Sequence, residues 1–198
     1  THGKYTLDTK TYTLPTVPET TVPVAYAVTP AAGALGVADG TTISVDVTDK
    51  KSATVSGVGV NVNTCVFQVS SPSTGTTVYQ EAGTNDVAIA NAAIDYGRRY
   101  TITPTVAFAE SETVSVSVSG CADTATPSIN TMTTYNYTFQ TVDTAAPVIS
   151  NLSPVNDGLA GATTDVSFDI TDSGLGVSLA NTFVVVNGTY YAATTGAK

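Results

Sequence analysis

The sequence repeats itself, and this repeat constrains the fold more than any other feature. Residues 147–154 (PVISNLSP) correspond to residues 23–30 (PVAYAVTP) at an offset of 124. Residues 166–172 (VSFDITD) then correspond to residues 43–49 (ISVDVTD) at an offset of 123. An offset of this size is typical of one folded domain followed by a related one. The chain is therefore predicted to form two domains in tandem.

The second repeat is predicted to be incomplete. Residues 174–177 (GLGV) and 182–186 (TFVVV) still match residues 57–60 (GVGV) and 65–69 (CVFQV), with the offset reduced to 117. The sequence reaches Lys198 before the counterparts of the later strand segments of the first repeat. An open sheet with uncovered edges is expected there, and such edges pair readily with another chain.

Alternation of apolar and polar residues predicts strands. Residues 43–48, 65–69 and 114–118 each place apolar side chains on every second position, which is the pattern of a strand with one buried face. A strand is also expected at residues 135–139, and another from Tyr100 through Phe108. Residues 87–94 fit either a strand or one helical turn. The predicted architecture is all-β, a β-sandwich built from short strands and turns.

Composition and charge restrict the partners. Only 12% of the residues are charged and the net charge is −9, which argues against nucleic acid and anionic membranes. The sequence has no run of about 18 apolar residues, so no membrane span is expected. Abundant Thr and Val with few Leu favour strands over helices. These properties are typical of a secreted, extracellular protein.

Cys65 and Cys121 are the two cysteines, and their spacing is not that of a metal site. A disulfide between them would stabilise the first domain by roughly 4 kcal/mol if its effect is to restrict the unfolded chain. The alternative is two unpaired thiols that pack as small apolar groups. The disulfide is the favoured interpretation, and it fits an oxidising compartment.

Several motifs together resemble the bacterial Ig-like (Big-type) repeats of extracellular surface and appendage proteins. They are a Ser/Thr-Pro pair, a strand that ends in Thr-Asp, a Gly-x-Gly-Val loop, an Asn-Gly turn and the joint at residues 143–147 (DTAAP). The resemblance covers residues 23–198 and implies tandem Ig-like sandwiches, as in adhesins, S-layers, appendages and virion fibres. The domains are then an extended arm at 1–22, a complete sandwich at 23–143 and an incomplete one at 144–198.

The N-terminal arm resembles the closing strands of such a domain. Residues 3–7 (GKYTL) are similar to residues 98–102 (RRYTI), and residues 12–17 (YTLPTV) are similar to residues 137–142 (YTFQTV). The arm therefore carries the kind of strand that the second repeat lacks. Together the arm and the second repeat have the size of a small Ig-like domain.

The sequence therefore suggests a structural protomer of an extracellular filament. The arm of one copy would complete the incomplete domain of the next, head to tail, by strand complementation. The anchors would be Tyr5, Leu7, Tyr12 and Leu14. The alternative is a stalk or ligand-binding Ig-like module of a larger adhesin, S-layer or phage virion protein, in which the arm completes an upstream domain. The expected partners are copies of this chain, with glycans as a second candidate.

No enzymatic activity and no cofactor are expected. His2 is the only histidine, which removes histidine-based catalytic and zinc sites. The aspartate pairs 46/49 and 169/172 recur in both repeats, so Asp49 and Asp172 are weak Ca²⁺ candidates, together with Asp39 or Asp157. Solvated aspartates at strand ends and in turns are the favoured interpretation, because the ligand spacing of a Ca²⁺ loop is absent.

Three sites match the acceptor pattern for N-glycosylation. Asn136 and Asn187 are the better candidates, whereas Asn151 is weakened by Pro154 after its Ser153. Matches of this kind arise often by chance in a chain so rich in Thr.

Overall fold

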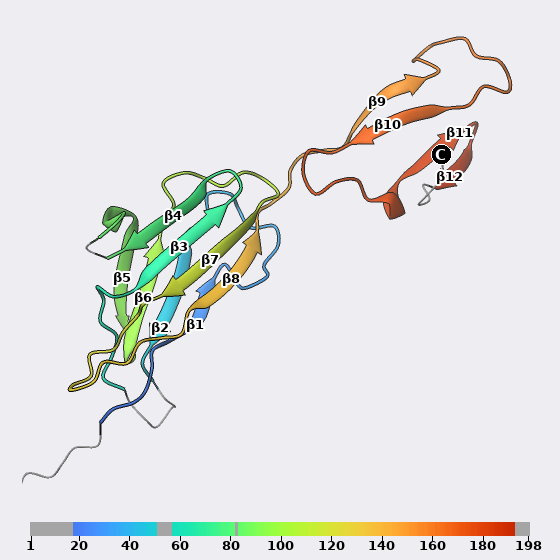
Figure 1. Ribbon diagram of the computed structural model, residues 1–198. Coiled ribbons are helices and arrows are strands. Elements are labelled where there is room, and N and C mark those ends of the chain that lie inside the picture. The colour runs from blue at the N-terminus through green and yellow to red at the C-terminus, as the bar shows by residue number, and fades with distance from the viewer. Residues whose placement is uncertain (1–17, 51–56, 82, 193–198) are drawn as a thin grey trace, which may run out of the picture.

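The computed structural model describes residues 18–50, 57–81 and 83–192. The first unit, residues 23–143, contains two four-stranded antiparallel sheets that face each other (Figure 1). One sheet has the order β1 (Val24–Thr29), β2 (Ile43–Thr48), β6 (Gly97–Ile102) and β5 (Ile89–Ile94). The other has the order β4 (Gly75–Gln80), β3 (Val66–Ser71), β7 (Thr113–Ser119) and β8 (Tyr135–Gln140).

The core of the first unit lies between these two sheets, as the alternating pattern predicts. The apolar side chains of β2 and β7 are buried, while the serines between those of β7 face outward. The rings of Phe67 on β3 and Tyr100 on β6 meet across the core with centroids 4.8 Å apart. The predicted all-β, Ig-like sandwich is therefore confirmed for this unit.

Two strand predictions need adjustment. The segment at residues 87–94 contains both predicted forms, because the 3-10 helix η1 (Asp86–Ala88) leads directly into β5. The predicted extension of β6 to Phe108 is wrong, since β6 ends at Ile102. Pro104 has no backbone N–H to give to a sheet, which disfavours continuation of the strand. Phe108 is nevertheless buried, because its ring packs edge-on against Phe139 at 6.0 Å.

Cys65 and Cys121 form the predicted disulfide, and both are fully buried. Cys65 directly precedes β3, and Cys121 follows β7 after one glycine. Because β3 and β7 are neighbours in one sheet, the bond joins the ends of adjacent strands and does not link the two sheets. It therefore fixes the place where the loop between β7 and β8 leaves the sandwich.

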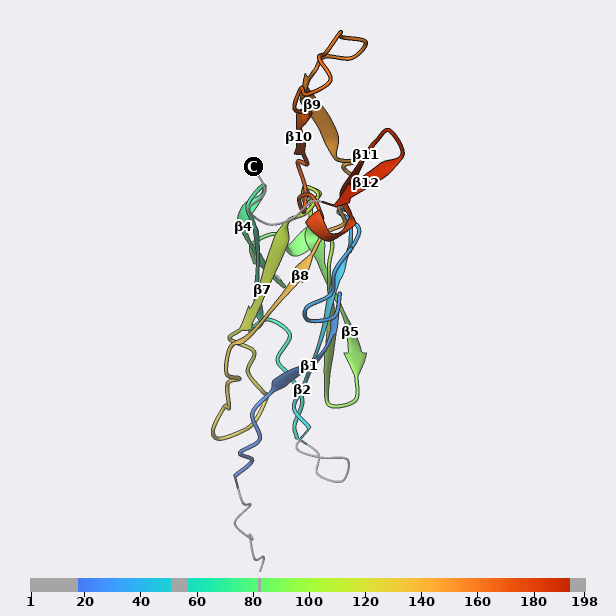
Figure 2. The ribbon, with the colours of Figure 1, turned by 90° about the vertical axis from the view of Figure 1, so that its right-hand side faces the viewer.

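The described part of the second unit consists of two separate antiparallel pairs (Figures 1 and 2). β9 (Val148–Ser153) pairs with β10 (Ser167–Thr171). β11 (Phe183–Val186) pairs with β12 (Thr189–Ala192), after the 3-10 helix η2 (Leu179–Asn181). No other strand lies in the described residues after Gln140.

The strand registers agree with the internal repeat. Val24 faces Thr48 in the first unit, and the corresponding residues Val148 and Thr171 face each other in the second. Phe67 faces Tyr79 in the β3–β4 pair, and the corresponding pair in the β11–β12 hairpin is Val184 opposite Tyr191. The second unit thus contains the counterparts of β1 to β4. Among the described residues, no helix is long and apolar enough to cross a bilayer.

Candidate functional site

The second unit exposes the apolar side chains that the first unit buries. Tyr191 is 56% exposed and Val186 is 41% exposed, whereas their counterparts in the first unit, Tyr79 and Val69, are each 2% exposed. None of the apolar side chains among its described residues is buried. The apolar residues exposed on its strands are Val148, Ile149, Leu152, Phe183, Val185, Val186, Tyr190 and Tyr191.

Two strand edges of this unit are also open. In the first unit β2 pairs with both β1 and β6, and β3 pairs with both β4 and β7. In the second unit β10 pairs only with β9, and β11 only with β12, among the described residues. Open backbone edges beside exposed apolar side chains form a surface that a further strand can complete. We call this surface the open face of the second unit.

The predicted anchors Tyr5, Leu7, Tyr12 and Leu14 lie outside the described residues. The two predicted glycosylation acceptors are exposed. Asn136 lies on β8. Asn187 lies in the tight turn between β11 and β12, where Asn187 and Gly188 both have positive φ angles of 49° and 78°. Positive φ at two successive residues is typical of a two-residue Asn-Gly hairpin turn. Their glycosylation stays a prediction.

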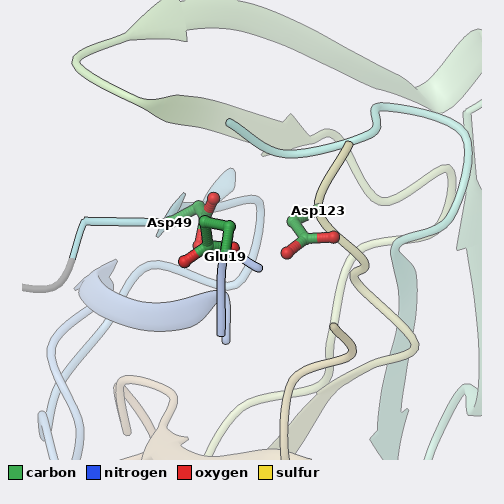
Figure 3. Close-up of side chains that lie close together, drawn as sticks. All are labelled: Glu19, Asp49 and Asp123. Carbon is green, nitrogen blue, oxygen red and sulfur yellow. The ribbon is translucent and has the colours of Figure 1, made fainter. Parts of the chain in front are cut away.

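A carboxylate cluster lies where the chain enters the first unit (Figure 3). Glu19 precedes β1, Asp49 follows β2 and Asp123 follows β7. One oxygen from each of these residues lies within 4.8 Å of the others. We call Glu19, Asp49 and Asp123 the carboxylate cluster.

Asp49 is the most deeply buried member of the cluster. Its side chain is fully buried, and its Oδ2 accepts hydrogen bonds from the backbone N–H groups of Val58 at 2.7 Å and Gly59 at 3.1 Å. Its Oδ1 is also buried and has no hydrogen-bond partner among the described residues. Burial raises the pKa of Asp49 above its usual value, although the hydrogen bonds from Val58 and Gly59 oppose that shift. The cluster therefore contains a buried carboxylate oxygen that lacks a partner.

Asn130 forms hydrogen bonds with both of the other members, Asp123 and Glu19. Its Nδ2 donates to Asp123 Oδ2 at 2.6 Å and to Glu19 Oε2 at 3.1 Å, and its backbone N–H donates to Asp123 Oδ1 at 2.9 Å. Burial alone would raise the pKa of Asp123, but the hydrogen bonds from Asn130 and Ala125 outweigh burial and leave that pKa below its usual value. Asp123 is therefore held as an anion.

The structure separates the aspartate pairs that the sequence suggested. Asp46 forms a two-point ion pair with Arg99, at 2.6 and 2.7 Å, and does not join Asp49. In the second unit Asp169 accepts a hydrogen bond from Asn151 at 2.6 Å. Of the two weak Ca²⁺ candidates, Asp49 belongs to the carboxylate cluster and Asp172 does not. Sequence reasoning missed Glu19 and Asp123, which come from segments far from Asp49 and share no local spacing with it.

The second junction repeats part of this arrangement. Asp172, the counterpart of Asp49, accepts hydrogen bonds at Oδ1 from the N–H groups of Gly174 at 2.8 Å and Gly176 at 3.1 Å. Asp143 occupies the place in the second joint that Glu19 has in the first, and its Oδ2 accepts from Leu175 N–H at 2.6 Å. In both units, backbone N–H groups of the Gly-x-Gly loop therefore donate hydrogen bonds to carboxylates at a strand end or in the joint.

Comparison with known proteins adds no family to this picture. No protein-family model matches the chain, and no curated protein is significantly similar to it. The resemblance to Big-type repeats therefore stays a prediction from motifs, and the functional argument rests on the open face and the carboxylate cluster.

Proposed function

We propose that this protein is a structural protomer of an extracellular filament, in which each copy completes the second unit of its neighbour. The observation that carries the proposal is the open face, where exposed apolar side chains lie beside two strand edges that pair with no other described strand. The buried disulfide of the first unit supports an extracellular location, since such bonds persist in oxidising compartments. The occupant of the open face is the N-terminal arm of a second copy.

The topology of the first unit suggests how the arm is arranged. The two arm segments resemble β6 and β8, which lie in different sheets and run in the same direction (Figure 1). Only residues 8–11 separate the two arm segments, too few to carry the chain back along a strand of about 20 Å. We therefore propose that the arm, once bound to a neighbouring copy, forms a hairpin of two antiparallel strands. In the first unit β7 and β8 form such a pair.

The register of β7 and β8 suggests a position for each anchor. Val116 faces Tyr137, and Val114 faces Phe139, and all four side chains are buried. Alignment of residues 12–17 with residues 137–142 puts Tyr12 at the place of Tyr137 and Leu14 at the place of Phe139. A four-residue turn then sets Leu7 opposite Tyr12 and Tyr5 opposite Leu14. In this arrangement all four predicted anchors would fall on positions that face the core.

The same arrangement suggests where the hairpin binds. In the first unit β7 pairs with the edge of β3, whose counterpart in the second unit is β11. The first arm strand would pair with the open edge of β11, and the second arm strand would lead through the joint before β1 into the next copy. Such a contact is heterologous, so it extends into a filament unless its rotation closes a ring. Main-chain hydrogen bonds supply affinity, and the anchors supply specificity.

Two charge substitutions on the same arm strand test this proposal. Leu14→Asp places a charge at a core-facing position and is expected to abolish filaments, because a carboxylate would enter an apolar site. Thr13→Asp is the matched control, since its counterpart Thr138 is exposed on β8. It is expected to leave assembly intact. Electron microscopy and sedimentation report filament length for both variants.

Deletion of residues 1–17 should also give monomers, and a synthetic peptide of residues 1–17 should bind those monomers. Filaments that form equally well without residues 1–17, or with Leu14→Asp, would contradict strand complementation. A chain that stays monomeric and whose open face does not bind the peptide would favour the second function, a stalk or ligand-binding module of a larger surface or virion protein.

A further inference from the structure

We propose that Glu19, Asp49 and Asp123 bind a divalent cation of the size of Ca²⁺, which fastens the joint before β1 to the end of the first sandwich. This inference does not depend on filament formation, because all three residues belong to one chain and to the described part of it. It rests on the placement of three carboxylates around one point and on a buried oxygen that has no partner.

The unpartnered oxygen is the first argument. Asp49 is fully buried, its Oδ2 accepts from two backbone N–H groups, and its buried Oδ1 accepts no hydrogen bond from the part of the chain that the structure describes. A buried charged group without a partner is costly, so such an oxygen is expected to have a ligand. Glu19 and Asp123 each place an oxygen within 4.8 Å of an Asp49 oxygen and add negative charge, and neither can donate a hydrogen bond while ionised.

The described basic side chains do not neutralise this cluster. Lys50 pairs with Asp95, Arg99 pairs with Asp46, and Arg98 donates to Asn91 at 3.3 Å. Three carboxylates within 4.8 Å of one another therefore lack a counter-ion among these residues. A bound cation supplies the missing positive charge.

The donor set and its dimensions select the kind of cation. All three side chains offer oxygen, which suits a hard cation such as Ca²⁺ or Mg²⁺. Ca²⁺ binds oxygen at about 2.3–2.6 Å, so two of its ligands can stand up to roughly 5 Å apart, whereas Mg²⁺ needs less than about 4.2 Å. The three carboxylate oxygens lie within 4.8 Å of one another, and this limit falls inside the range that Ca²⁺ can bridge. Backbone carbonyls and water would complete the coordination.

Backbone contacts hold together the two loops that surround Asp49 and Asp123. Val60 and Asp123 form an antiparallel bridge, Asn61 N–H donates to Ala122 O at 2.8 Å, and Thr124 N–H donates to Gly59 O at 3.1 Å. These contacts tie the loop that holds Asp49 Oδ2 to the loop that carries Asp123. The disulfide at Cys121 fixes the start of the second loop. Two of the three ligands are thus held in place before the cation arrives.

Glu19 is the ligand through which a bound cation would hold the joint before β1. It lies in the joint that leads into β1, whereas Asp49 follows a strand of one sheet and Asp123 follows a strand of the other. A cation shared by these residues would connect the joint to both sheets. The direction in which the chain enters the sandwich would then be set by the bound ion.

Titration of the full-length chain with CaCl₂, after removal of metal with EDTA, tests the proposal. One Ca²⁺ per chain is expected by isothermal titration calorimetry. The Tm of the first unit should rise by roughly 5–10 °C at about a hundredfold excess of CaCl₂ over its Kd. MgCl₂ at the same concentration should give a smaller shift. Absence of heat and of a Tm shift in the intact protein would overturn the proposal.

Three variants separate the site from a general effect of charge. Asp49→Asn and Asp123→Asn should each lose most of the Ca²⁺-dependent shift, while Asp39→Asn, on an exposed turn, should keep all of it. Asp49→Asn also controls for misfolding as a cause of lost Ca²⁺ binding. In EDTA its Tm should equal or exceed that of the parent, because the new amide keeps an acceptor for Val58 and Gly59 and can donate to the neighbouring carboxylates. Ca²⁺ stabilisation that persists unchanged in Asp49→Asn and Asp123→Asn would place the ion elsewhere and contradict the assignment.

Discussion

Gly97 shows how closely the strands of the first unit approach each other. It begins β6 opposite Thr48, and a Cβ built there would overlap the carbonyl oxygen of Val47 and lie 2.7 Å from Thr48 Cα. Both of these neighbours are backbone atoms of β2, so they cannot turn aside as a flexible side chain would. The position therefore requires glycine for reasons of space.

Gly97→Ala is accordingly expected to lower the free energy of unfolding of the first unit by about 1–3 kcal/mol. Gly40→Ala is the matched control, because a Cβ at Gly40 meets nothing within 4 Å and its φ is not in the left-handed region. It should change stability by less than about 0.5 kcal/mol. Urea unfolding followed by circular dichroism measures both, and equal stability of the two variants would contradict the steric explanation.

At the carboxylate cluster, sequence could identify one residue of three. Asp49 was singled out because it ends an alternating strand and recurs as Asp172. Glu19 stands in a joint between prolines and Asp123 in a loop after Cys121, and neither position has a spacing that predicts a ligand. The three meet only because the joint, the end of β2 and the loop after β7 converge at one end of the sandwich (Figure 3). That convergence is a property of long-range packing, which local patterns do not contain.

The disulfide belongs to the element scale, since it joins the ends of two strands. Replacement of both cysteines, as Cys65→Ala with Cys121→Ala, should destabilise the first unit by about 2–4 kcal/mol. It should also weaken Ca²⁺ binding about tenfold or more, because the loop that carries Asp123 loses its fixed start and ligand positions depend on such support. Thermal unfolding and calorimetry test the two effects separately. Unchanged Ca²⁺ affinity in a destabilised variant would show that the loop is held by its other contacts.

Strands with strict alternation could be predicted from sequence, and their neighbours could not. Residues 43–48 and 114–118 each place apolar side chains on one face, and both are strands in the structure. Phe108 was wrongly assigned to a strand, because a buried aromatic in a loop has the same apolar character as one in a sheet. The pairing of β2 with β6 and of β3 with β7 joins segments far apart in the chain, and no local signal specifies such partners.

At the scale of the whole molecule, the internal repeat predicted the tandem arrangement of related units. The structure contributes the sheet order, and the sheet order changes what the arm is expected to be. The similarity of the two arm segments to β6 and β8 would by itself place them in two different sheets. The register of β7 with β8 suggests instead that the two segments form one hairpin beside β11. Sequence similarity between strands is a weak guide here, because many strands share the same alternation.

The positions where the chain enters and leaves the first unit determine how the protein would carry mechanical load. β1 begins at one end of the sandwich and β8 finishes at the opposite end (Figures 1 and 2). A pull along the chain therefore acts parallel to β1 and β2, so their hydrogen bonds resist together in shear and are not opened one at a time. The first unit is thus suited to transmit tension along a fibre.

Single-molecule stretching of the oxidised and reduced protein checks this consequence. Cys65 and Cys121 are 56 residues apart, so an intact disulfide should shorten the extension gained on unfolding by roughly 190 Å relative to the reduced chain. Equal extension in both states would mean that the segment between the cysteines lies outside the part that unfolds under load. With the bond intact, the segment between Cys65 and Cys121 would not extend even after the sandwich unfolds. A fibre of such units would then lengthen in short steps.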